Sequence, residues 1–400
     1  MATKYIVVGA GVAGATACQA ILDTDPYGEI SLFSDEPCPF YSRMRLPEVI
    51  SGKSDPQRLV LRTTAWFQQK GIDFHLGEPI QEMGLDPLRV VSQKGEYRAD
   101  RLLLATGGYS FLPPIPGTHL AGVFSLRSMS DAISIRDAAS QASRAVVLGG
   151  GVLGLELGNA LRLRGLGVMV VEVFERLLPR QTDPTAARIL QDTMERMGFQ
   201  FRLGAKAKEI QGDGDRARAL LLENGDALEA DVFVISAGVR PRLELARPAG
   251  LKLDKALMVD DRMQTSAPNV YAAGDCVQHR DVYYGIWAAA EEQGRVAGIN
   301  MAGGRAVYKG TLMSNQLKVL GIDLLAAGQI DPEGNLEAEV SADPIKGVYR
   351  KLVYQEDRIV GAILLGDLSG HRNILRALEE AKSVSHLKGS LLDNPDALYG

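Results

Sequence analysis

The chain has 400 residues, which is enough for two or three domains, and its hydrophobic content of 46% and charged content of 23% are ordinary for a globular protein. Proteins that bind nucleic acid or an anionic membrane usually have an excess of positive charge, and the formal net charge of −5 gives no such indication. Three scattered cysteines, none of them spaced as CxxC, exclude a disulfide framework and a cysteine-bound zinc site. With no signal-peptide pattern and no apolar stretch long enough for a membrane span, we expect a cytoplasmic protein.

The first feature along the chain is a unit of strand, glycine turn and helix that occurs twice. Each copy has a short apolar run, three glycines spaced as GxGxxG, a helical stretch and a returning apolar run. Short apolar runs of this kind are typical of buried parallel strands, so the two copies predict two doubly wound α/β domains. In chain order the units are 5–8 with Gly9, Gly11 and Gly14 and a returning strand at 30–33, and 145–148 with Gly149, Gly151 and Gly154 and a returning strand at 168–171.

The glycines of each unit indicate a dinucleotide site. The first glycine allows a tight turn, the second lets a pyrophosphate approach the backbone, and the third lets the helix pack against the strand. The helix then presents free N–H groups and a partial positive charge to the phosphates. Because strand, turn and helix are present both times, we expect two bound dinucleotides rather than two glycine turns without a ligand.

An acid at the end of each returning strand completes this prediction, because its carboxylate can bond a ribose hydroxyl. In the first unit the choice lies between Asp35 and Glu36, of which Asp35 fits the strand end better. In the second unit the acid is Glu172, whose charge repels a 2′-phosphate and so favours NADH over NADPH. The nearby Arg176 can weaken that preference.

The remaining elements divide the chain into three parts. A proline-rich crossing at 111–117 is typical of a domain boundary, and the chain changes character from about Tyr308, with a hairpin across 350–365 and a helix over 371–382. Further buried strands are expected at 102–105, 232–236 and 270–273. We therefore predict an α/β chain of two doubly wound Rossmann-type nucleotide-binding domains plus a small α+β C-terminal domain, divided as 1–111 with 242–307, 112–241, and 308–400, the final dozen residues being poorly ordered.

The whole chain resembles the FAD-dependent pyridine nucleotide–disulfide oxidoreductase superfamily. Beside the two glycine units, the resemblance rests on Leu104-Ala-Thr-Gly-Gly108, Ile235-Ser-Ala-Gly-Val-Arg-Pro241 and Thr265-Ser-Ala-Pro-Asn-Val-Tyr-Ala-Ala-Gly-Asp275. It implies that the first unit holds FAD, bound non-covalently, and that the second holds NADH. It also implies hydride transfer between the two, for which the protein supplies position and electrostatics and needs little acid–base chemistry.

The same resemblance implies roles near the flavin. Gly274 and Asp275 match the second FAD motif, in which the carboxylate accepts a hydrogen bond from the ribityl chain, and an N-cap role for Asp275 is an alternative. Glu156 matches a position facing the flavin–nicotinamide junction, with an ordinary first-turn glutamate as the alternative. Trp287 matches the helix that lines the flavin, with domain-interface packing as the alternative.

One position argues against the disulfide-reducing branches of the superfamily. Those members carry a redox cysteine beside the flavin, and aligning Leu46-Pro47 with their Gly-Leu-Pro-like stretch places Met44 at that position. A thioether cannot form a thiolate or a mixed disulfide. Cys38 lies six residues earlier and would need a shifted register to take this role.

The pattern Tyr41-x-Arg43-x-x-Leu46 instead resembles a branch without that cysteine. This branch contains NADH:rubredoxin reductases, the flavin module of assimilatory nitrite reductase and oxygenase-type ferredoxin reductases. Glu48 stands where the ferredoxin reductases have lysine, so the rubredoxin-reductase group looks closer. The resemblance makes Arg43 the cation expected near the FAD pyrophosphate, with a surface arginine as the alternative.

The C-terminal part supports the same branch. Segments 317–322 and 359–367 look like those of rubredoxin and nitrite reductase flavin domains. The cysteine-rich extension and sirohaem domain of nitrite reductase are absent, so the chain is not expected to reduce nitrite alone.

These motifs predict a complete set of site residues and a function. The expected cofactor-binding residues are Gly9, Gly11, Gly14, Asp35, Glu36, Arg43, Ala105, Thr106, Gly107, Gly149, Gly151, Gly154, Glu156, Glu172, Gly238, Gly274, Asp275 and Trp287, with no metal ligands. We expect electrons to pass from NADH through FAD to a small carrier such as rubredoxin. Two alternatives stay open, namely an NADH oxidase or disulfide reductase that uses Cys38, and a redox-sensing flavoprotein with little turnover. The oligomeric state also stays open, because the C-terminal domain suits a homodimer contact or a carrier dock equally well.

Overall fold

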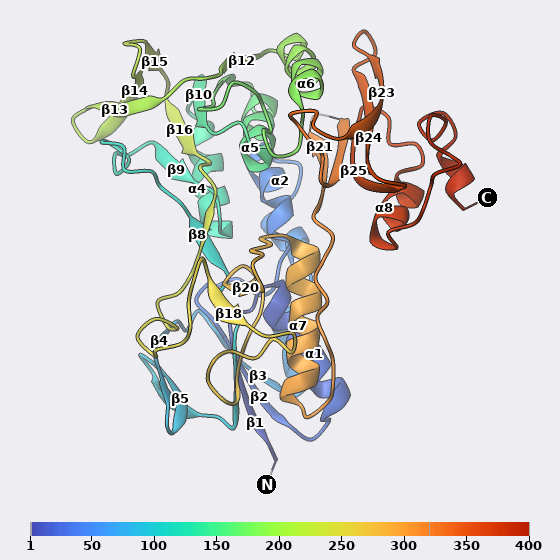
Figure 1. The fold of residues 1–400 in the computed structure, drawn as a ribbon. Coiled ribbons are helices and arrows are strands. Elements are labelled where there is room, and N and C mark those ends of the chain that lie inside the picture. The colour runs from blue at the N-terminus through green and yellow to red at the C-terminus, as the bar shows by residue number, and fades with distance from the viewer. Residues whose placement is uncertain (1, 320, 400) are drawn as a thin grey trace.

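The computed structural model describes residues 2–319 and 321–399, and three large sheets organise its three parts (Figure 1). The first Rossmann domain, at the bottom of the view, contains the amino-terminal strands. The second Rossmann domain lies at the top, and the C-terminal domain lies at the upper right. Among the described residues, no helix is long and apolar enough to cross a membrane.

The first Rossmann domain is built on five parallel strands in the order β19-β7-β1-β2-β3. Register pairs Val8 with both Phe33 and Leu104, so the central strands end together at the first glycine turn. Helices cover such a sheet on both faces, and this explains why its strands are continuous apolar runs. The strands are β1 (Lys4–Val8), β2 (Glu29–Ser34), β3 (Ile72–Leu76), β7 (Arg101–Leu104) and β19 (Val270–Ala272).

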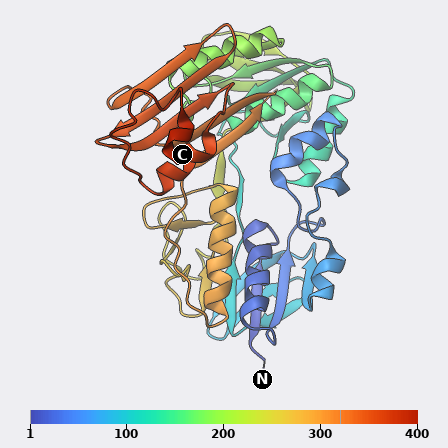
Figure 2. The ribbon, with the colours of Figure 1, turned by 90° about the vertical axis from the view of Figure 1, so that its right-hand side faces the viewer.

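Two helices far apart in sequence fix the position of that turn. Helix α1 (Val12–Thr24) runs beside α7 (Trp287–Met301), as both views show (Figures 1 and 2). A Cβ on Gly294 would stand 2.3 Å from the Ala13 carbonyl oxygen, and a Cβ on Gly298 would stand 2.5 Å from that of Ala17. The two backbones therefore approach closely, and α7 holds the helix that starts at the glycine turn.

The second Rossmann domain repeats the design, with five parallel strands in the order β12-β11-β10-β16-β9. Its strands are β9 (Val123–Ser125), β10 (Arg144–Leu148), β11 (Gly167–Val171), β12 (Phe199–Arg202) and β16 (Val232–Ile235). Its helices are α4 (Met129–Ala139), α5 (Val152–Leu163) and α6 (Pro184–Arg196). The predicted pair of doubly wound domains is thus confirmed.

The C-terminal domain is an antiparallel sheet, in the order β21-β22-β25-β24-β23, with one helix. The predicted hairpin and helix are confirmed as β24, β25 and α8. Leu320, within the segment 317–322, lies outside the described residues. The elements are β21 (Ser314–Val319), β22 (Ile322–Gly328), β23 (Glu337–Asp343), β24 (Val348–Gln355), β25 (Arg358–Leu365), α8 (His371–Glu379) and η3 (Pro395–Leu398).

The expectation of a poorly ordered carboxyl terminus is wrong for the described residues. Leu391, Leu392 and Leu398 are buried in one core with Ile374 of α8 and Leu364 of β25. The three leucines of this segment are therefore spaced so that each of them reaches the core.

Several smaller elements had no clear signal in the sequence. Short helices α2 (Leu46–Ser51) and α3 (Thr64–Gln69) follow the first returning strand. Two three-stranded antiparallel sheets comprise β4 (Ile80–Leu85), β5 (Leu88–Ser92) and β6 (Gly95–Arg98), and β13 (Ala207–Asp213), β14 (Arg216–Leu222) and β15 (Ala227–Glu229). Two-stranded pairs join β8 (Gly108–Ser110) to β17 (Val239–Pro241) and β18 (Leu257–Val259) to β20 (Val277–His279).

We propose the domain division 1–111 with 242–307, 112–241, and 308–400. Each of the three large sheets takes all its strands from one of these parts. The two crossings between the Rossmann domains lie side by side as the β8–β17 pair.

Candidate functional site

The first glycine turn closes tightly at two positions and is open at the third. A Cβ on Gly9 would stand 2.1 Å from the Ala105 carbonyl oxygen, and one on Gly14 would stand 1.9 Å from that of Gly9. A Cβ on Gly11 would meet no described atom within 4 Å. Gly11 is also the N-cap of α1, without a side-chain cap, so the first N–H groups of the helix are free for an anion. This cradle fits a pyrophosphate.

The second glycine turn has the same geometry. A Cβ on Gly149 would stand 2.2 Å from the Ser236 carbonyl oxygen, and one on Gly154 would stand 2.0 Å from that of Gly149. Gly151, the uncapped N-cap of α5, again faces open space among the described atoms. The repeat seen in the sequence is therefore a repeat of two pyrophosphate cradles.

Glu172 lies against the second turn. Its Oε2 accepts a hydrogen bond from the Gly150 amide at 2.6 Å, and its Oε1 accepts one from the Phe174 amide at 3.0 Å. The carboxylate is thus held at the end of β11, where it can meet a ribose hydroxyl and repel a 2′-phosphate. Arg176 instead donates to the Pro179 carbonyl oxygen and lies 4.0 Å from the Glu333 carboxylate, so its contacts do not bring it to Glu172.

The two acids at the end of β2 have different surroundings. Asp35 is half exposed and accepts from Arg242 at 2.9 Å. Glu36 is more enclosed, pairs with Arg43 and accepts from the Tyr41 hydroxyl at 2.6 Å. Arg43 also donates to the Arg127 carbonyl oxygen, so its side chain is held between two partners and is not free on the surface. Asp35 remains the more accessible acid at the strand end.

Arg127 is a site residue that the sequence reasoning missed. It lies between β9 and α4, and its Nη2 donates to the Asp275 Oδ2 at 2.8 Å while its Nε donates to the Gly108 carbonyl oxygen at 3.0 Å. Its own carbonyl oxygen accepts from Arg43 at 2.7 Å. The local signal was a capping box of Ser128 and Asp131 that begins α4, but nothing local indicates a partner 148 residues away.

Asp275 is positioned by its neighbours on both sides. Gly274 has a left-handed backbone with φ of 87°, and its amide donates to the Gln293 side chain at 2.9 Å. The N-cap alternative for Asp275 is wrong, because β20 follows it and Ile286 is the N-cap of α7. Since Arg127 holds Oδ2, the other carboxylate oxygen is available to a ribityl hydroxyl.

Ala105, Thr106 and Gly107 lie at the end of β7, beside the first turn. The Ala105 amide donates to the Val8 carbonyl oxygen at 2.8 Å, and the Thr106 hydroxyl donates to the Arg242 carbonyl oxygen at 3.2 Å. Gly107 and Gly238 both have left-handed φ, of 68° and 99°, in the two crossings between the Rossmann domains. These residues shape the backbone around the first turn.

Glu156 and Trp287 lie on the helices that follow the two fingerprint motifs. Glu156 is the fifth residue of α5, so the alternative of a first-turn glutamate is wrong. It has no hydrogen-bond or ion-pair partner among the described residues, and burial raises its pKa to about 7, as is common for acids in functional sites. Trp287 begins α7 and stacks on Phe40 with ring centroids 5.9 Å apart. This contact lies within the first Rossmann domain, not between domains.

The surroundings of the three thiols disfavour the charged thiolate form. Met44 is 63% exposed in the turn that precedes α2. Burial, with a smaller contribution from Glu36, raises the pKa of the half-buried Cys38 thiol, whereas a reactive thiol needs a lowered pKa. Cys18 and Cys276 are fully buried, and burial raises their pKa as well.

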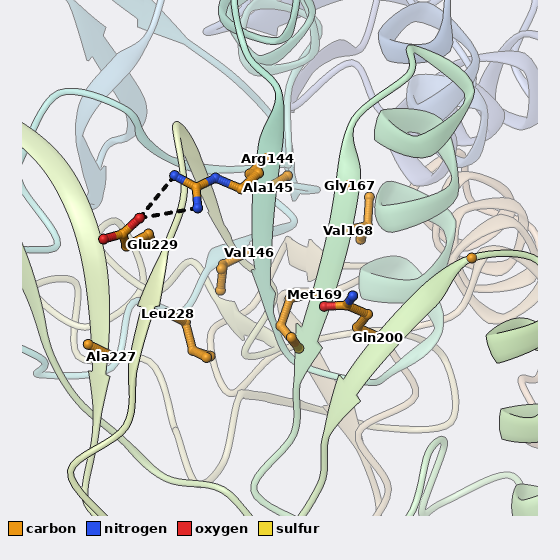
Figure 3. Close-up of a pocket in the computed structure, with 11 residues that line it drawn as sticks. Arg144, Ala145, Val146, Gly167, Val168, Met169, Gln200, Ala227, Leu228 and Glu229 are labelled. Atoms are coloured by element: carbon orange, nitrogen blue, oxygen red, sulfur yellow. Dashed lines mark hydrogen bonds and ion pairs between the residues drawn. The ribbon is translucent and has the colours of Figure 1, made fainter.

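A pocket elsewhere in the second Rossmann domain is distinct from these cradles. Arg144 and Gly167 line it at the amino ends of β10 and β11, opposite β15, and Arg144 pairs with Glu229 across it at 3.2 Å (Figure 3). Ligands of open α/β sheets bind at the carboxyl ends of the strands, which is the opposite edge. Within the described residues, no group of three or more His, Cys, Asp or Glu residues could hold a metal ion.

The fold and the two cradles define a protein that binds two dinucleotides at the carboxyl ends of two parallel sheets. Residues 3–294 match the pyridine nucleotide-disulphide oxidoreductase family, and residues 314–382 match the rubredoxin NAD+ reductase C-terminal domain. The chain therefore belongs to the pyridine nucleotide-disulphide oxidoreductase family. Its cofactors are FAD and NADH, as predicted, and the residues of both cradles fit a pyrophosphate.

Curated relatives match most or nearly all of the chain. It is 34% identical to the NAD(P)H nitrite reductase of Bacillus subtilis, over 96% of this chain and 48% of that protein. It is 32% identical to the assimilatory nitrate reductase electron transfer subunit of the same organism, over 98% of this chain and 51% of that protein. The chain thus spans about half the length of these relatives. It is also 34% identical to the rubredoxin-NAD(+) reductase of Ectopseudomonas oleovorans, over 72% of this chain and 75% of that protein.

Solved structures share the complete fold. A ferredoxin reductase from Rhodopseudomonas palustris superposes with a TM-score of 0.91 at 25% identity, covering 100% of both chains. The NADH:rubredoxin oxidoreductase from Clostridium acetobutylicum superposes with a TM-score of 0.83 at 26% identity, covering 98% of this chain and 100% of that one.

Proposed function

We propose that the chain passes electrons from NADH, through FAD held at the first glycine turn, to a small electron-carrier protein such as rubredoxin. The observation that carries this proposal is the pair of open cradles in a chain that has methionine at position 44, where disulfide-reducing members have a redox cysteine, and in which burial raises the pKa of the Cys38 thiol. With no cysteine at position 44, we expect the electrons to pass from the flavin directly to an acceptor outside the chain. The match of the C-terminal domain to that of rubredoxin reductases supports the choice of carrier.

The main predicted site residues have roles in this proposal. When bound, FAD accepts a hydride from NADH and can release its electrons one at a time. The turn from Gly9 to Gly14 binds the FAD pyrophosphate, Asp35 its ribose, and Asp275, held by Arg127, the ribityl chain. Arg43 links the Glu36 carboxylate to the Arg127 carbonyl oxygen beside this site.

The NADH side uses fewer polar groups. The second turn binds the pyrophosphate, and Glu172 selects the unphosphorylated ribose. Glu156 faces the junction of the two rings, where its buried carboxyl group is partly protonated at neutral pH.

Anaerobic titration with NADH, followed by stopped-flow mixing with a panel of carriers, tests the proposal. We expect one NADH to bleach one flavin and rubredoxin to reoxidise it far faster than dioxygen does. Reoxidation by every carrier at or below the rate with dioxygen would contradict it. Light scattering during size-exclusion chromatography decides between a monomer and a homodimer.

A second candidate function is an electron-transfer subunit for a nitrate or nitrite reductase. The 34% and 32% identities to the two Bacillus subtilis proteins favour it. In that case the reduced chain would transfer electrons to a nitrite- or nitrate-reducing partner and leave rubredoxin oxidised.

Two further alternatives make separate predictions. A disulfide reductase or NADH oxidase that uses Cys38 would lose turnover in Cys38→Ala, and full turnover of this variant with every acceptor removes that alternative. A redox sensor would stay reduced for minutes in air and change its assembly state when NADH is added.

A further inference from the structure

The loop 172–183 is attached to the second glycine turn at two points. It begins at Glu172, whose carboxylate accepts from the Gly150 amide, and it returns at Leu178, whose amide donates to the Gly150 carbonyl oxygen at 3.1 Å. Gly150 is the middle residue of the turn. Any movement of this loop therefore moves the backbone that meets the NADH pyrophosphate and the acid that meets its ribose.

The same loop contributes two side chains to a core that also includes residues of the C-terminal domain. Leu177 and Leu178 are fully buried in one core with Tyr349 of β24 and Ile363 of β25. Leu178 has φ of 50°, in the left-handed region that side chains with a Cβ avoid. Such a backbone persists where its surroundings hold it, and here the buried core and the hydrogen bond to Gly150 supply them.

A buried polar cluster closes the contact at the end of the loop. The Asp183 Oδ2 accepts from the Tyr349 hydroxyl at 2.5 Å and lies 3.3 Å from the Lys351 Nζ. Lys351 also donates to the Asp331 carbonyl oxygen at 2.7 Å, and the Asp183 Oδ1 accepts from the Ala186 amide at the start of α6. Lys351 and Asp183 are 4% and 6% exposed, so this ion pair is shielded from solvent.

A second ion pair across the contact is weak by comparison. Arg176 and Glu333 are 4.0 Å apart, and the Glu333 side chain is 73% exposed. Exposed pairs of this kind contribute little, whereas removing one partner of a buried pair leaves an uncompensated charge. The cluster of Asp183, Tyr349 and Lys351 is therefore the main polar link between the loop and the C-terminal domain.

We infer that the C-terminal domain forms part of the NADH site, with Lys351 and Tyr349 as positioning residues that act through the loop 172–183. The inference rests on the proposed function for its NADH ligand. It makes the C-terminal domain a determinant of nucleotide affinity, in addition to any carrier that it binds. The FAD cradle lies in the other Rossmann domain and does not contact this cluster.

Lys351→Met removes the cation and keeps most of the side-chain volume. Asp183 then loses its charge partner, and the loop loses the geometry that holds Glu172 and Gly150. If only roughly a tenth of the molecules keep the loop conformation that binds nucleotide, the apparent Kd for nucleotide rises about tenfold. Tyr349→Phe removes only a hydroxyl and should shift the Kd in the same direction by a smaller factor.

The experiment compares the FAD-loaded wild type with Lys351→Met, Tyr349→Phe and the conservative Lys351→Arg. Hydrogen exchange of peptides from 172–183 in the free protein reports the loop directly. ADP-ribose carries the pyrophosphate and the adenosine ribose but no nicotinamide. Calorimetry with ADP-ribose therefore measures the affinity of the second glycine turn and Glu172 for this part of the nucleotide. Stopped-flow reduction over a range of NADH concentrations separates affinity from the rate at saturation. Lys388→Met is the matched control, because Lys388 pairs with Glu337 within the C-terminal domain.

We expect Lys351→Met to exchange faster in 172–183 and to bind ADP-ribose about tenfold more weakly, with flavin content and the saturated reduction rate unchanged. Lys351→Arg should restore most of the affinity, and Lys388→Met should match the wild type. Unchanged exchange and unchanged ADP-ribose affinity in Lys351→Met, even with a lower melting temperature, would overturn the inference. A wild type that NADH does not reduce would refute the proposed function instead, and the exchange comparison would still decide the loop contact.

Discussion

Glu156 carries a carboxyl group that is partly protonated at neutral pH because burial disfavours its charge. Its pKa of about 7 lies well above the ordinary value of 4.5. Between these two values the folded protein holds a proton that the unfolded chain has released. The free energy of unfolding therefore falls as pH rises from about 4.5 to 7, by an amount on the order of 3 kcal/mol, and levels off above that.

Glu156→Gln should remove this pH dependence. We expect the variant to match the wild type near pH 4.5 and to be more stable than it at pH 8, because an amide has no charge to desolvate. Melting temperatures at pH 5 and pH 8 measure the difference. A wild type and a variant that lose the same stability between these pH values would show that Glu156 titrates normally.

In the proposed function, Arg127 connects the second Rossmann domain to the FAD site through Asp275. In Arg127→Met, Asp275 loses the charged donor that holds its Oδ2. We expect FAD to bind about thirtyfold more weakly, which corresponds to roughly 2 kcal/mol for a hydrogen bond to a charged group. Recovery of flavin fluorescence on dilution measures the release. Arg136→Met is the control, since Arg136 pairs with Asp137 on the exposed face of α4, and equal flavin loss in both variants would contradict the assignment.

At the scale of elements, different glycines of each turn serve folding and ligand binding. A Cβ on Gly14 meets backbone at 1.9 Å, whereas a Cβ on Gly11 meets open space. We expect Gly14→Ala to lower the melting temperature of the apoprotein, and Gly11→Ala to leave it unchanged while abolishing FAD retention. Gly151→Ala should keep FAD and weaken NADH binding by at least about tenfold, by intrusion on the pyrophosphate.

Flavin content, NADH-dependent bleaching and apoprotein melting measure these three outcomes. An FAD-replete Gly11→Ala protein would show that the pyrophosphate lies elsewhere. Destabilised apoprotein in Gly11→Ala would show instead that the open space beside this glycine is used by the fold.

The elements that the sequence predicts well are those whose signal is local. The parallel strands around Val8 and Leu148 are apolar runs next to glycine turns, and both are present within a residue of the predicted bounds. The small antiparallel sheets were missed because strands such as β4 mix polar and apolar residues without strict alternation and lie mostly at the surface.

The parts of the site that the sequence predicts are also those with a local signal. Both cradles and Glu172 follow from motif spacing, and the structure brings Glu172 to its turn. Arg127 was missed because its role depends on a partner from the other end of the chain. The contact of Asp183 with Tyr349 spans 166 positions, and no local pattern indicates it.

At the scale of the whole molecule, the C-terminal domain lies above α7 and against the second Rossmann domain (Figure 2). Its β24 and β25 face α6 and the loop 172–183, and one core includes side chains from both domains. Interfaces between domains of one chain are often small and polar, which permits relative motion. The apolar core found here favours a fixed arrangement of these two domains.

Removal of residues 314–400 should therefore destabilise the second Rossmann domain. The core that holds Leu177 and Leu178 would lose Tyr349 and Ile363, at a cost of about 3–6 kcal/mol for two buried apolar side chains, and Asp183 would lose its partners. We expect the melting transition of the truncated chain to fall by roughly 10 °C. FAD binding by the first Rossmann domain should persist at low temperature, because its sheet and cradle take no strand from the removed segment. A truncated chain that melts with the full-length protein and binds ADP-ribose equally well would show that the C-terminal domain is only appended to the nucleotide-binding domains.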